Sequence, residues 1–408
     1  MNSAEHWLWI AGIGEDGWDG LNSEARQAIA AAELLYGGTR HLALIPSESS
    51  SATRIPWPSP MAPAIQKILT EHRGHRRTVV LASGDPMFYG VGVPLTRELS
   101  GDEFRVIPQI SALSLACARL GWPVAETSVV SLVHRPMSQL HRHLYPTQRV
   151  LVLSEDGRTP FEVASFLKRA GFGRSKLSVL ENLGGPSERL TSGVAADWGE
   201  ERSSNLNVVA IFCVRDPMGE SLPLLPGLPD DAFETDGQMT KREVRAVTLA
   251  RLAPLPGQLL WDVGAGTGTI GIEWMRVHPS CSCIAFEQHH DRAARVQRNA
   301  ERLGVPGLKV IHGPAPETFT GLASPDAIFI GGGLADEDLF HACWNALASG
   351  GRLVANAVTI ESEACLVARR AQYGGDLMRM MVSRADPVGS SHAWRPMMPI
   401  TQWTVTKP

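Results

Sequence analysis

The stretch Leu259-Leu-Trp-Asp-Val-Gly-Ala-Gly-Thr-Gly268 decides the fold of the second half of the chain. An apolar strand-like run leads straight into a turn with glycine at positions 264, 266 and 268, and a helical pattern follows from about Thr269 to Arg276. Glycines let a backbone turn sharply and approach a ligand closely. Free amides at the start of a helix then face that ligand. The pattern predicts a parallel α/β sheet with a ligand site at the end of this strand.

An acidic residue at the end of the next apolar run supports the prediction of a ligand site. Glu287 follows Gly268 by 19 positions, and an acid in this place can accept hydrogen bonds from ribose hydroxyls. The glycine spacing is not the G-x-G-x-x-G of dinucleotide folds. Asp262 and the tight turn resemble motif I of class I methyltransferases, which implies S-adenosylmethionine. A nicotinamide cofactor and a merely structural turn are the alternatives.

Length and composition predict two domains. The chain has 408 residues, 44% of them apolar and 20% charged, with a net charge of −4. Asp216–Asp231 holds four prolines and two glycines without a helical or strand period, which is typical of a linker. We expect one domain at 1–215, a linker at 216–228 and a second domain at 229–408. Because basic residues do not outnumber acidic ones, the composition argues against a nucleic-acid partner. No apolar run is long enough to span a membrane.

Apolar strand-like runs alternate with helical segments in both halves, which predicts α/β domains with mainly parallel sheets. Pro46–Pro63 is expected to be a long surface loop. The predicted strands are Trp7–Ala11, Thr78–Ala82, Val129–Val133, Val150–Leu153, Leu177–Glu181, Asn207–Cys213, Leu259–Val263, Cys283–Glu287, Leu308–Ile311, Ala327–Ile330 and Arg352–Asn356.

Further motifs of the second half support the methyltransferase interpretation. They are Pro229-Asp-Asp-Ala-Phe233, Met239-Thr-Lys-Arg-Glu-Val-Arg245, His312-Gly-Pro-Ala-Pro316 and Pro325-Asp-Ala-Ile-Phe-Ile-Gly-Gly-Gly333. In this order they resemble the decarboxylating methyltransferases of cobalamin biosynthesis, which act on the precorrin-6 ring. The resemblance covers residues 229–408 and implies a Rossmann-like class I fold. The cofactor-binding residues that it implies are Thr240, Gly264, Ala265, Gly266, Thr267, Gly268, Glu287 and Ala315.

Three motifs of the first half resemble a different family. They are Ile10-Ala-Gly-Ile-Gly14, Leu81-Ala-Ser-Gly-Asp-Pro-Met-Phe-Tyr-Gly90 and Ile107-Pro-Gln-Ile-Ser-Ala-Leu-Ser114. Gly84-Asp85-Pro86 alone would be an ordinary turn, but the three together resemble the tetrapyrrole methylases. That family has two α/β subdomains with S-adenosylmethionine between them, and Gln109-Ile110 departs from its common pattern. The cofactor-binding residues implied here are Gly84, Asp85, Gly90, Ser111 and Ala112.

Two such halves in one chain resemble fused corrin-ring enzymes of cobalamin biosynthesis. The resemblance implies two S-adenosylmethionine sites, methylation at C5 by the first half, and methylation at C15 with loss of the C12 acetate carboxyl by the second, giving precorrin-8X. It also suggests self-association. No catalytic acid or base is assigned. A methyltransferase of RNA or protein, or a non-catalytic module that binds S-adenosylmethionine or a corrinoid, are the alternatives.

Arginines should hold the carboxylates of such a substrate, because the guanidinium group binds carboxylates in a bidentate way. The candidates are Arg242, Arg245, Arg384 and Arg395, and a first-half loop adds His134, Arg135, His141 and Arg142. Cys281-Ser-Cys283 lacks the usual zinc spacing, so we expect buried cysteines and no metal. Six scattered cysteines suit a reducing cytoplasm.

Overall fold

The computed structural model describes residues 6–219 and 221–408, which divide into two compact units. The first unit runs to Arg135 and resumes at Leu144, and the second takes Pro136–His143 together with the chain from Ser221 onward. The sequence-based boundaries did not anticipate that the short segment 136–143 groups with the second unit. Leu228, expected in the linker, is fully buried in the core of the second unit.

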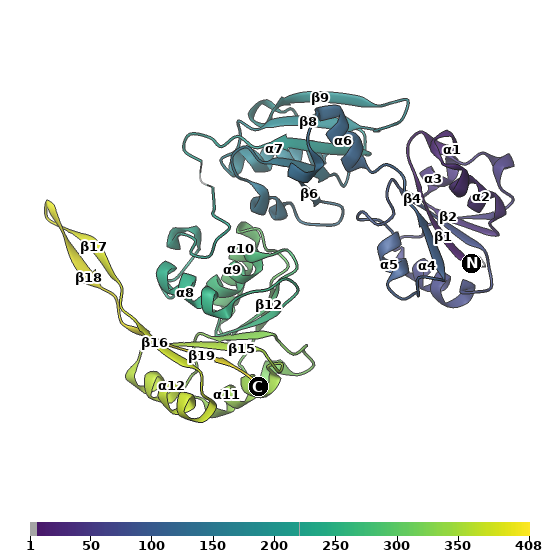
Figure 1. The fold of residues 1–408 in the computed structure, drawn as a ribbon. Helices are drawn as coiled ribbons and strands as arrows, with labels where there is room; N and C mark the ends of the chain where they lie inside the picture. Colours follow the sequence, from purple (N-terminus) through teal and green to yellow (C-terminus); the bar gives the residue numbers. More distant parts are fainter. Residues whose placement is uncertain (1–5, 220) are drawn as a thin grey trace. The chain divides into compact units, whose positions relative to one another are not determined.

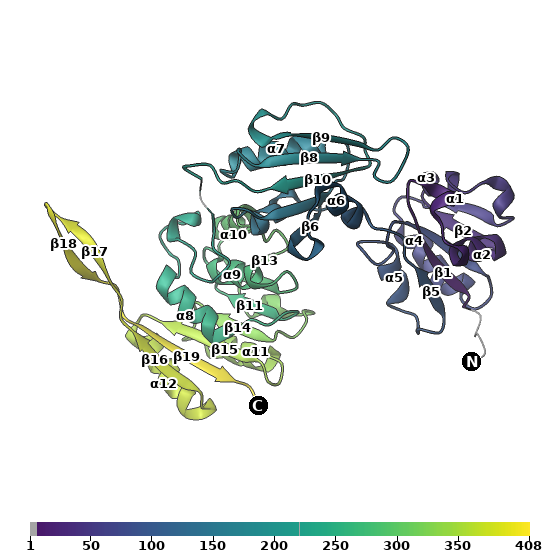
Figure 2. The same cartoon turned by 45° about the horizontal axis from the view of Figure 1, so that its top comes forward.

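A seven-stranded sheet is the base of the second unit, and its five neighbouring strands β13 to β15 run parallel (Figures 1 and 2). β19 is antiparallel to both of its neighbours. The Rossmann-like fold expected here is confirmed. In order across the sheet the strands are β13 (Lys309–His312), β12 (Ser282–Glu287), β11 (Leu259–Val263), β14 (Ala327–Ile330), β15 (Arg352–Ala357), β19 (Ile400–Thr406) and β16 (Asp376–Met380).

Helices cover both faces of this sheet because successive strand residues point to opposite sides. Leu260 packs in the core beneath α8 (Arg242–Leu252), α9 (Thr269–Val277) and α10 (His290–Arg302). Trp261, the next residue, packs in the opposite core beneath α11 (Glu337–Ala346) and α12 (Ile360–Tyr373). Cys281 and Cys283 are buried as predicted.

A two-stranded hairpin extends from the edge of this sheet (Figures 1 and 2). β17 (Ser383–Val388) pairs with β18 (Ser391–Pro396), and Trp394 remains 76% exposed. In this register Arg384 lies opposite Arg395. An isolated hairpin is at best marginally stable in water, so this arm depends on its other contacts.

The first unit begins with a five-stranded parallel sheet. Helices α2 (Ser23–Ala31) and α3 (Thr39–Ala43) cover one face, and α4 (Ala62–Lys67) and α5 (Gly92–Thr96) cover the other. α1 (Gly17–Gly20) follows the first strand. Across the sheet the strands are β3 (Thr53–Pro56), β2 (Leu34–Gly37), β4 (Thr78–Ser83), β1 (Leu8–Ile13) and β5 (Phe104–Ile107).

A second five-stranded sheet follows, and it corrects the expectation of mainly parallel sheets. Only β6 and β7 are parallel, whereas β10 is antiparallel to β7 and β8, and β8 to β9. α6 (Ala112–Leu120) packs on this sheet, and α7 (Thr159–Arg169) follows β7. The strands in order are β6 (Thr127–Ser131), β7 (Arg149–Leu153), β10 (Asn207–Phe212), β8 (Lys176–Glu181) and β9 (Arg189–Val194). The two sheets confirm the expected pair of α/β subdomains.

The expected surface loop at Pro46–Pro63 is also corrected. It contains the edge strand β3, whose proline content suits an edge position, and its last residues begin α4. Within the part of the chain that the structure describes, no helix combines the length and apolar character needed to cross a membrane.

Candidate functional site

The glycine turn after β11 has a backbone that only glycine adopts easily. Gly264, Gly266 and Gly268 have φ angles of +71°, +59° and +78°. A Cβ atom on Gly264 would lie 3.2 Å from the amide nitrogen of Gly332. Glycine at these positions therefore lets the ends of β11 and β14 approach each other, as a site for a ligand pressed against the backbone requires.

Glu287, at the end of β12, points its carboxylate back at this turn. Its Oε2 atom accepts a hydrogen bond from the Gly266 amide at 2.8 Å, and Oε1 accepts one from the His289 amide at 2.9 Å. Its carbonyl oxygen also accepts from the Gly313 amide at 3.1 Å, which draws the loop after β13 to the same edge. The structure therefore brings together the turn, the acid and the loop that contains Ala315.

Aromatic rings form an apolar wall beside this loop. Phe319 lies 4.7 Å from Trp261 and 4.8 Å from Phe286, measured between ring centroids. Ala315 packs against the same cluster. Trp261 is a core residue, 2% exposed, because it lies in the buried strand β11. Because Trp261 and Phe286 are buried, only the partly buried Phe319 and Ala315 can offer apolar surface to the aromatic ring of a ligand beside the polar turn.

Residues 227–241, which include Thr240, run beside the glycine turn. We call this segment the strap. The Thr267 hydroxyl donates to the carbonyl of Gln238 at 2.9 Å, so the strap contacts the glycine turn directly. Asn299 on α10 donates to the carbonyls of Glu234 and Thr267. Gln238 and Asn299 were not predicted as site residues. Each is a single polar side chain, and the sequence has no signal that separates such a residue from an ordinary surface position.

Arg245, a predicted substrate-binding residue, lies in the interior of the unit. Its side chain is fully buried, and its guanidinium binds the Glu273 carboxylate at 2.5 Å and the Thr240 carbonyl at 2.6 Å. It also donates to the Leu228 carbonyl. With its donors engaged by protein groups, Arg245 does not line an open site here.

The other candidate arginines are exposed. Arg384 forms ion pairs with Asp230 at 3.1 Å and Glu243 at 2.6 Å, while the backbone amide of Arg242 donates to Asp230. Arg395 pairs with Asp386. Asp230 therefore gathers Arg242 and Arg384 near the strap, and the hairpin register places Arg395 opposite Arg384.

Asp262 precedes the turn and is buried. One carboxylate oxygen accepts from the Gly271 amide at 2.9 Å, and the other has no hydrogen-bond partner. Burial raises the pKa of this carboxyl to about 7, with a smaller contribution from the Glu287 charge. Asp262 therefore supports the turn through its hydrogen bond to Gly271. Its raised pKa means that it takes up a proton near neutral pH.

The candidate site of the first unit lies at the carboxyl ends of β1, β4 and β5. Gly84 has a φ of +57°, and a Cβ there would lie 3.2 Å from the Ile110 carbonyl and from Ser111 Cα. A Cβ on Gly12 would overlap the Gly84 carbonyl, at 2.0 Å. The three motifs therefore meet, and Gly12 joins the site although only the motif around it was noted.

The predicted polar residues here organise their own loops. Asp85 accepts from the Met87 amide at 2.9 Å, and Ser111 caps α6 by accepting from the Ser114 amide at 3.2 Å. A Cβ on Gly90 would lie 2.3 Å from the Pro86 carbonyl, so the turn requires glycine. Ala112 begins α6 directly beside them.

The basic loop of the first half is divided between the units. Arg135 belongs to the first unit, and its guanidinium carbon lies 5.1 Å from the ring centroid of Tyr89. Arg142 donates to the Arg276 carbonyl within the second unit, and burial lowers the pKa of His141 to about 4. Only His134 and Arg135 therefore belong to the unit that holds the first candidate site.

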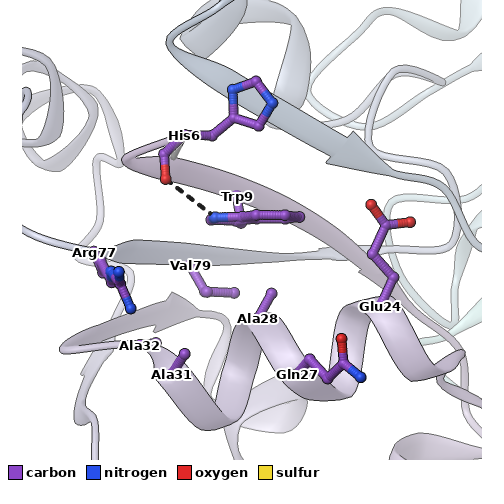
Figure 3. A pocket seen from close by; sticks show the side chains of 9 residues that line it. All are labelled: His6, Trp9, Glu24, Gln27, Ala28, Ala31, Ala32, Arg77 and Val79. Atoms are coloured by element: carbon purple, nitrogen blue, oxygen red, sulfur yellow. Dashed lines mark hydrogen bonds between the residues drawn. The ribbon is translucent and has the colours of Figure 1, made fainter. Parts of the chain in front are cut away.

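A cavity of about 200 Å³ opens elsewhere on the first unit, beside α2 (Figure 3). Trp9 and Val79 are the second residues of β1 and β4, so the cavity lies toward the amino ends of these strands. The glycine turns lie at the carboxyl ends, and the cavity is thus separate from the candidate site. It is lined by His6, Trp9, Glu24, Gln27, Ala28, Ala31, Ala32, Arg77 and Val79.

Comparison with known proteins agrees with this architecture. Residues 8–198 match the family described as tetrapyrrole (corrin/porphyrin) methylases, and residues 231–407 match the precorrin methyltransferase domain. A precorrin-6Y C(5,15)-methyltransferase [decarboxylating] from Sinorhizobium sp is 48% identical over 98% of this chain and 96% of its own length.

Two shorter relatives come from Salmonella typhimurium. A cobalt-precorrin-7 C(5)-methyltransferase is 32% identical over 47% of this chain and 94% of its own length. A cobalt-precorrin-6B C(15)-methyltransferase (decarboxylating) is 33% identical over 40% of this chain and 85% of its own.

Fold and motifs together define a methyltransferase with two unlike domains. Such enzymes use S-adenosylmethionine, and the close backbone approaches at Gly84 and Gly264 fit a cofactor held against main chain. The chain belongs to the family of decarboxylating precorrin-6Y C(5,15)-methyltransferases.

Proposed function

We propose that this chain methylates C5 and C15 of precorrin-6B (precorrin-6Y) and decarboxylates its C12 acetate, giving precorrin-8X in cobalamin biosynthesis. The observation that carries the proposal is the 48% identity to a precorrin-6Y C(5,15)-methyltransferase along nearly the whole chain. The first unit methylates C5, and the second methylates C15 and removes the carboxyl group. Two separate relatives, each covering less than half of the chain, support this division.

Each unit holds its own S-adenosylmethionine, whose sulfonium supplies an electrophilic methyl group. In the second unit Gly264 to Gly268 hold it against the main chain, Glu287 accepts from its ribose, and Ala315 and Thr240 border it. In the first unit Gly84, Asp85, Gly90, Ser111 and Ala112 have this role. The backbone crowding at Gly84 and Gly264 supports both assignments.

The protein contributes mainly alignment to this chemistry. Methyl transfer to an electron-rich ring carbon requires the two reacting atoms in line, and positioning alone can supply roughly 7–11 kcal/mol of the barrier. In decarboxylation the electrons of the broken C–C bond pass into the conjugated macrocycle, and a proton returns to the remaining carbon. We assign no protein residue as the acid or base.

Arg242 and Arg384 bind substrate carboxylates beside the second site, and Arg395 contributes from the hairpin. The ion pairs of Arg384 with Asp230 and Glu243, and of Arg395 with Asp386, are exposed, and exposed pairs are weak enough for a substrate carboxylate to displace. The side chain of Arg242 is exposed as well. We reassign Arg245 to the interior, because its guanidinium is buried and bonded to protein groups.

We also infer that the protein is a homo-oligomer and works in the reducing cytoplasm. The hairpin β17–β18 exposes Trp394 and Val388, and packing against a second copy would cover these side chains. None of the six cysteines forms a disulfide bond, as expected in a reducing compartment. Light scattering of the purified protein and of a hairpin-deleted chain tests the assembly.

Mass spectrometry of precorrin-6B incubated with the full chain and S-adenosylmethionine tests the reaction. The expected product carries two new methyl groups, one carbon dioxide is released, and two molecules of S-adenosylhomocysteine appear. A product with a single methyl group contradicts the two-site proposal. Bound tetrapyrrole without turnover would favour a binding module instead.

A further inference from the structure

We propose that Arg245 and Glu273 are positioning residues for the cofactor site of the second unit. Together they hold the strap, residues 227–241, in place over the glycine turn. The inference rests on the proposed function in one respect: the site that the strap borders is taken to bind S-adenosylmethionine. Neither side chain needs to touch the cofactor.

Glu273 on α9 fixes the first residues of the strap. Its carboxylate accepts hydrogen bonds from the Gly227 amide at 2.5 Å and the Leu228 amide at 2.9 Å. It also accepts from Arg245 Nε at 2.5 Å. Glu273 is 2% exposed and Arg245 is fully buried, so water does not compete for these bonds.

Arg245 on α8 then connects the beginning of the strap with its end. Its guanidinium donates to the Leu228 carbonyl and, at 2.6 Å, to the Thr240 carbonyl. It also lies 4.8 Å from the ring centroid of Phe233 in the middle of the strap. The planar guanidinium presents five donors in a fixed fork on three nitrogens, whereas lysine donates from a single nitrogen and cannot reproduce that spread.

The middle of the strap is attached to the glycine turn itself. The side chain of Asn299 donates to the carbonyls of Glu234 at 2.9 Å and Thr267 at 3.1 Å, and accepts from the Glu234 amide at 2.8 Å. The Thr267 hydroxyl donates to the Gln238 carbonyl. The strap and the turn therefore form one hydrogen-bonded frame, and Thr240 is placed by the Arg245 end of it.

The chemistry of the pair supports a positioning role. A buried ion pair is a poor source of stability compared with apolar packing, because both charges lose their hydration. Here the donors of Arg245 and the acceptors of Glu273 bind main chain at both ends of one segment. The pair thus fixes the conformation of the strap, which apolar side chains of similar size would leave free.

The test compares the full-length parent with the Arg245→Lys variant. The decarboxylating methylation is followed at increasing S-adenosylmethionine, and cofactor binding is measured separately by calorimetry. We expect the KM and the dissociation constant of the second site to rise about tenfold, as the loss of charge-assisted hydrogen bonds predicts. The kcat at saturating cofactor should remain that of the parent.

Arg369→Lys is the matched control. Arg369 is also buried, lies 4.1 Å from the Phe340 ring centroid and pairs with Glu337, but it belongs to the α11–α12 layer on the other face of the sheet. We expect a lower melting temperature with unchanged KM. An Arg245→Lys variant that likewise loses only melting temperature, or loses kcat at unchanged KM, overturns the proposal.

Asn299→Ala tests the same frame if Arg245→Lys does not fold. It should raise the KM and dissociation constant of the second site in the same direction, and unchanged values in a folded Asn299→Ala chain contradict the inference. Failure of the proposed function is recognised separately, because the parent would then release no carbon dioxide. Calorimetry needs no turnover and still measures the effect of the strap on cofactor affinity.

Discussion

The carboxylate of Glu287 and the amide of Gly266 are joined by a hydrogen bond of 2.8 Å, which ties the end of β12 to the glycine turn after β11. A second bond, from the His289 amide, fixes the other carboxylate oxygen. An ionised carboxylate offers about four acceptor sites, so these two bonds leave capacity for the hydroxyls of a ribose. The acid is thus oriented by the main chain before any ligand arrives.

Glu287→Ala should weaken cofactor binding at the second site about tenfold to a hundredfold, because hydrogen bonds to a charged group are worth roughly 1.5–3 kcal/mol. Calorimetry of the full chain should then show one weakened and one unchanged site. Thr240→Val is the comparison and should cost less, since a neutral hydroxyl contributes about 0.5–1.5 kcal/mol. Parent affinity at both sites in a folded Glu287→Ala chain would remove Glu287 from the pocket.

Gly84→Ala should abolish or strongly reduce methylation at C5 while leaving decarboxylation intact. The new methyl group would crowd the Ile110 carbonyl and Ser111 Cα at 3.2 Å. Gly74→Ala is a control in the same unit, because Gly74 has a similar φ of +69° and open space around it. The free energy of unfolding of both variants should fall by about 1 kcal/mol because of backbone strain. Mass spectrometry of the products should show that only Gly84→Ala loses C5 methylation. Equal C5 methylation by the two variants would refute the role of Gly84.

The protonation of Asp262 should make stability depend on pH. Burial raises its pKa to about 7 from 3.8, so between these values the folded chain holds a proton that the unfolded chain has lost. The contribution of Asp262 to stability is therefore full at low pH and is lost as the pH rises through about 7. Asp262→Asn cannot titrate, so its melting temperature relative to the parent should increase between about pH 4 and 7 and level off above that range. A pH-independent difference would contradict the assignment.

A fragment of Ser221–Pro408 should fold alone, decarboxylate the substrate and add one methyl group. It keeps Gly227 and Leu228, whose amides bind Glu273, and Pro223, whose carbonyl accepts from Arg276. A fragment that begins at Pro229 lacks these partners and should melt at a lower temperature. A folded but inert Ser221 fragment would contradict the proposal that residues 221–408 alone carry out decarboxylation and one methylation.

The parts of the fold that the sequence predicted are those with a local signal. Every predicted strand corresponds to an observed one, because most of these strands are continuous apolar runs bounded by turn residues. The missed strands include the edge strands β3 and β9, but also β2 and β19, which lie inside their sheets. β2 has only four residues, and β19 mixes polar with apolar residues, so neither forms a clear apolar run. Strand direction in the second sheet depends on chain connections that hydrophobic patterns do not contain.

The candidate sites also divide into features with a local sequence signal and features that depend on tertiary packing. Glycine turns have a local signature, and the structure places Gly84 and Gly264 at crowded strand ends. Arg245 was misjudged because a sequence does not state whether an arginine faces a solvent cleft or a buried glutamate. Its partner Glu273 lies 28 positions away on another helix, and only the packing of α8 against α9 brings the two together.

The buried cysteines have a consequence for following how the protein opens. Burial raises the pKa of Cys213 and Cys343 to about 12 and that of Cys283 well above its usual value. Because the thiolate is the reactive form, these thiols should resist alkylation while the chain is folded. Cys213 lies in the first unit and the other two in the second. The alkylation rate of Cys213 would therefore report transient unfolding of the first unit, and the rates of Cys283 and Cys343 would report that of the second.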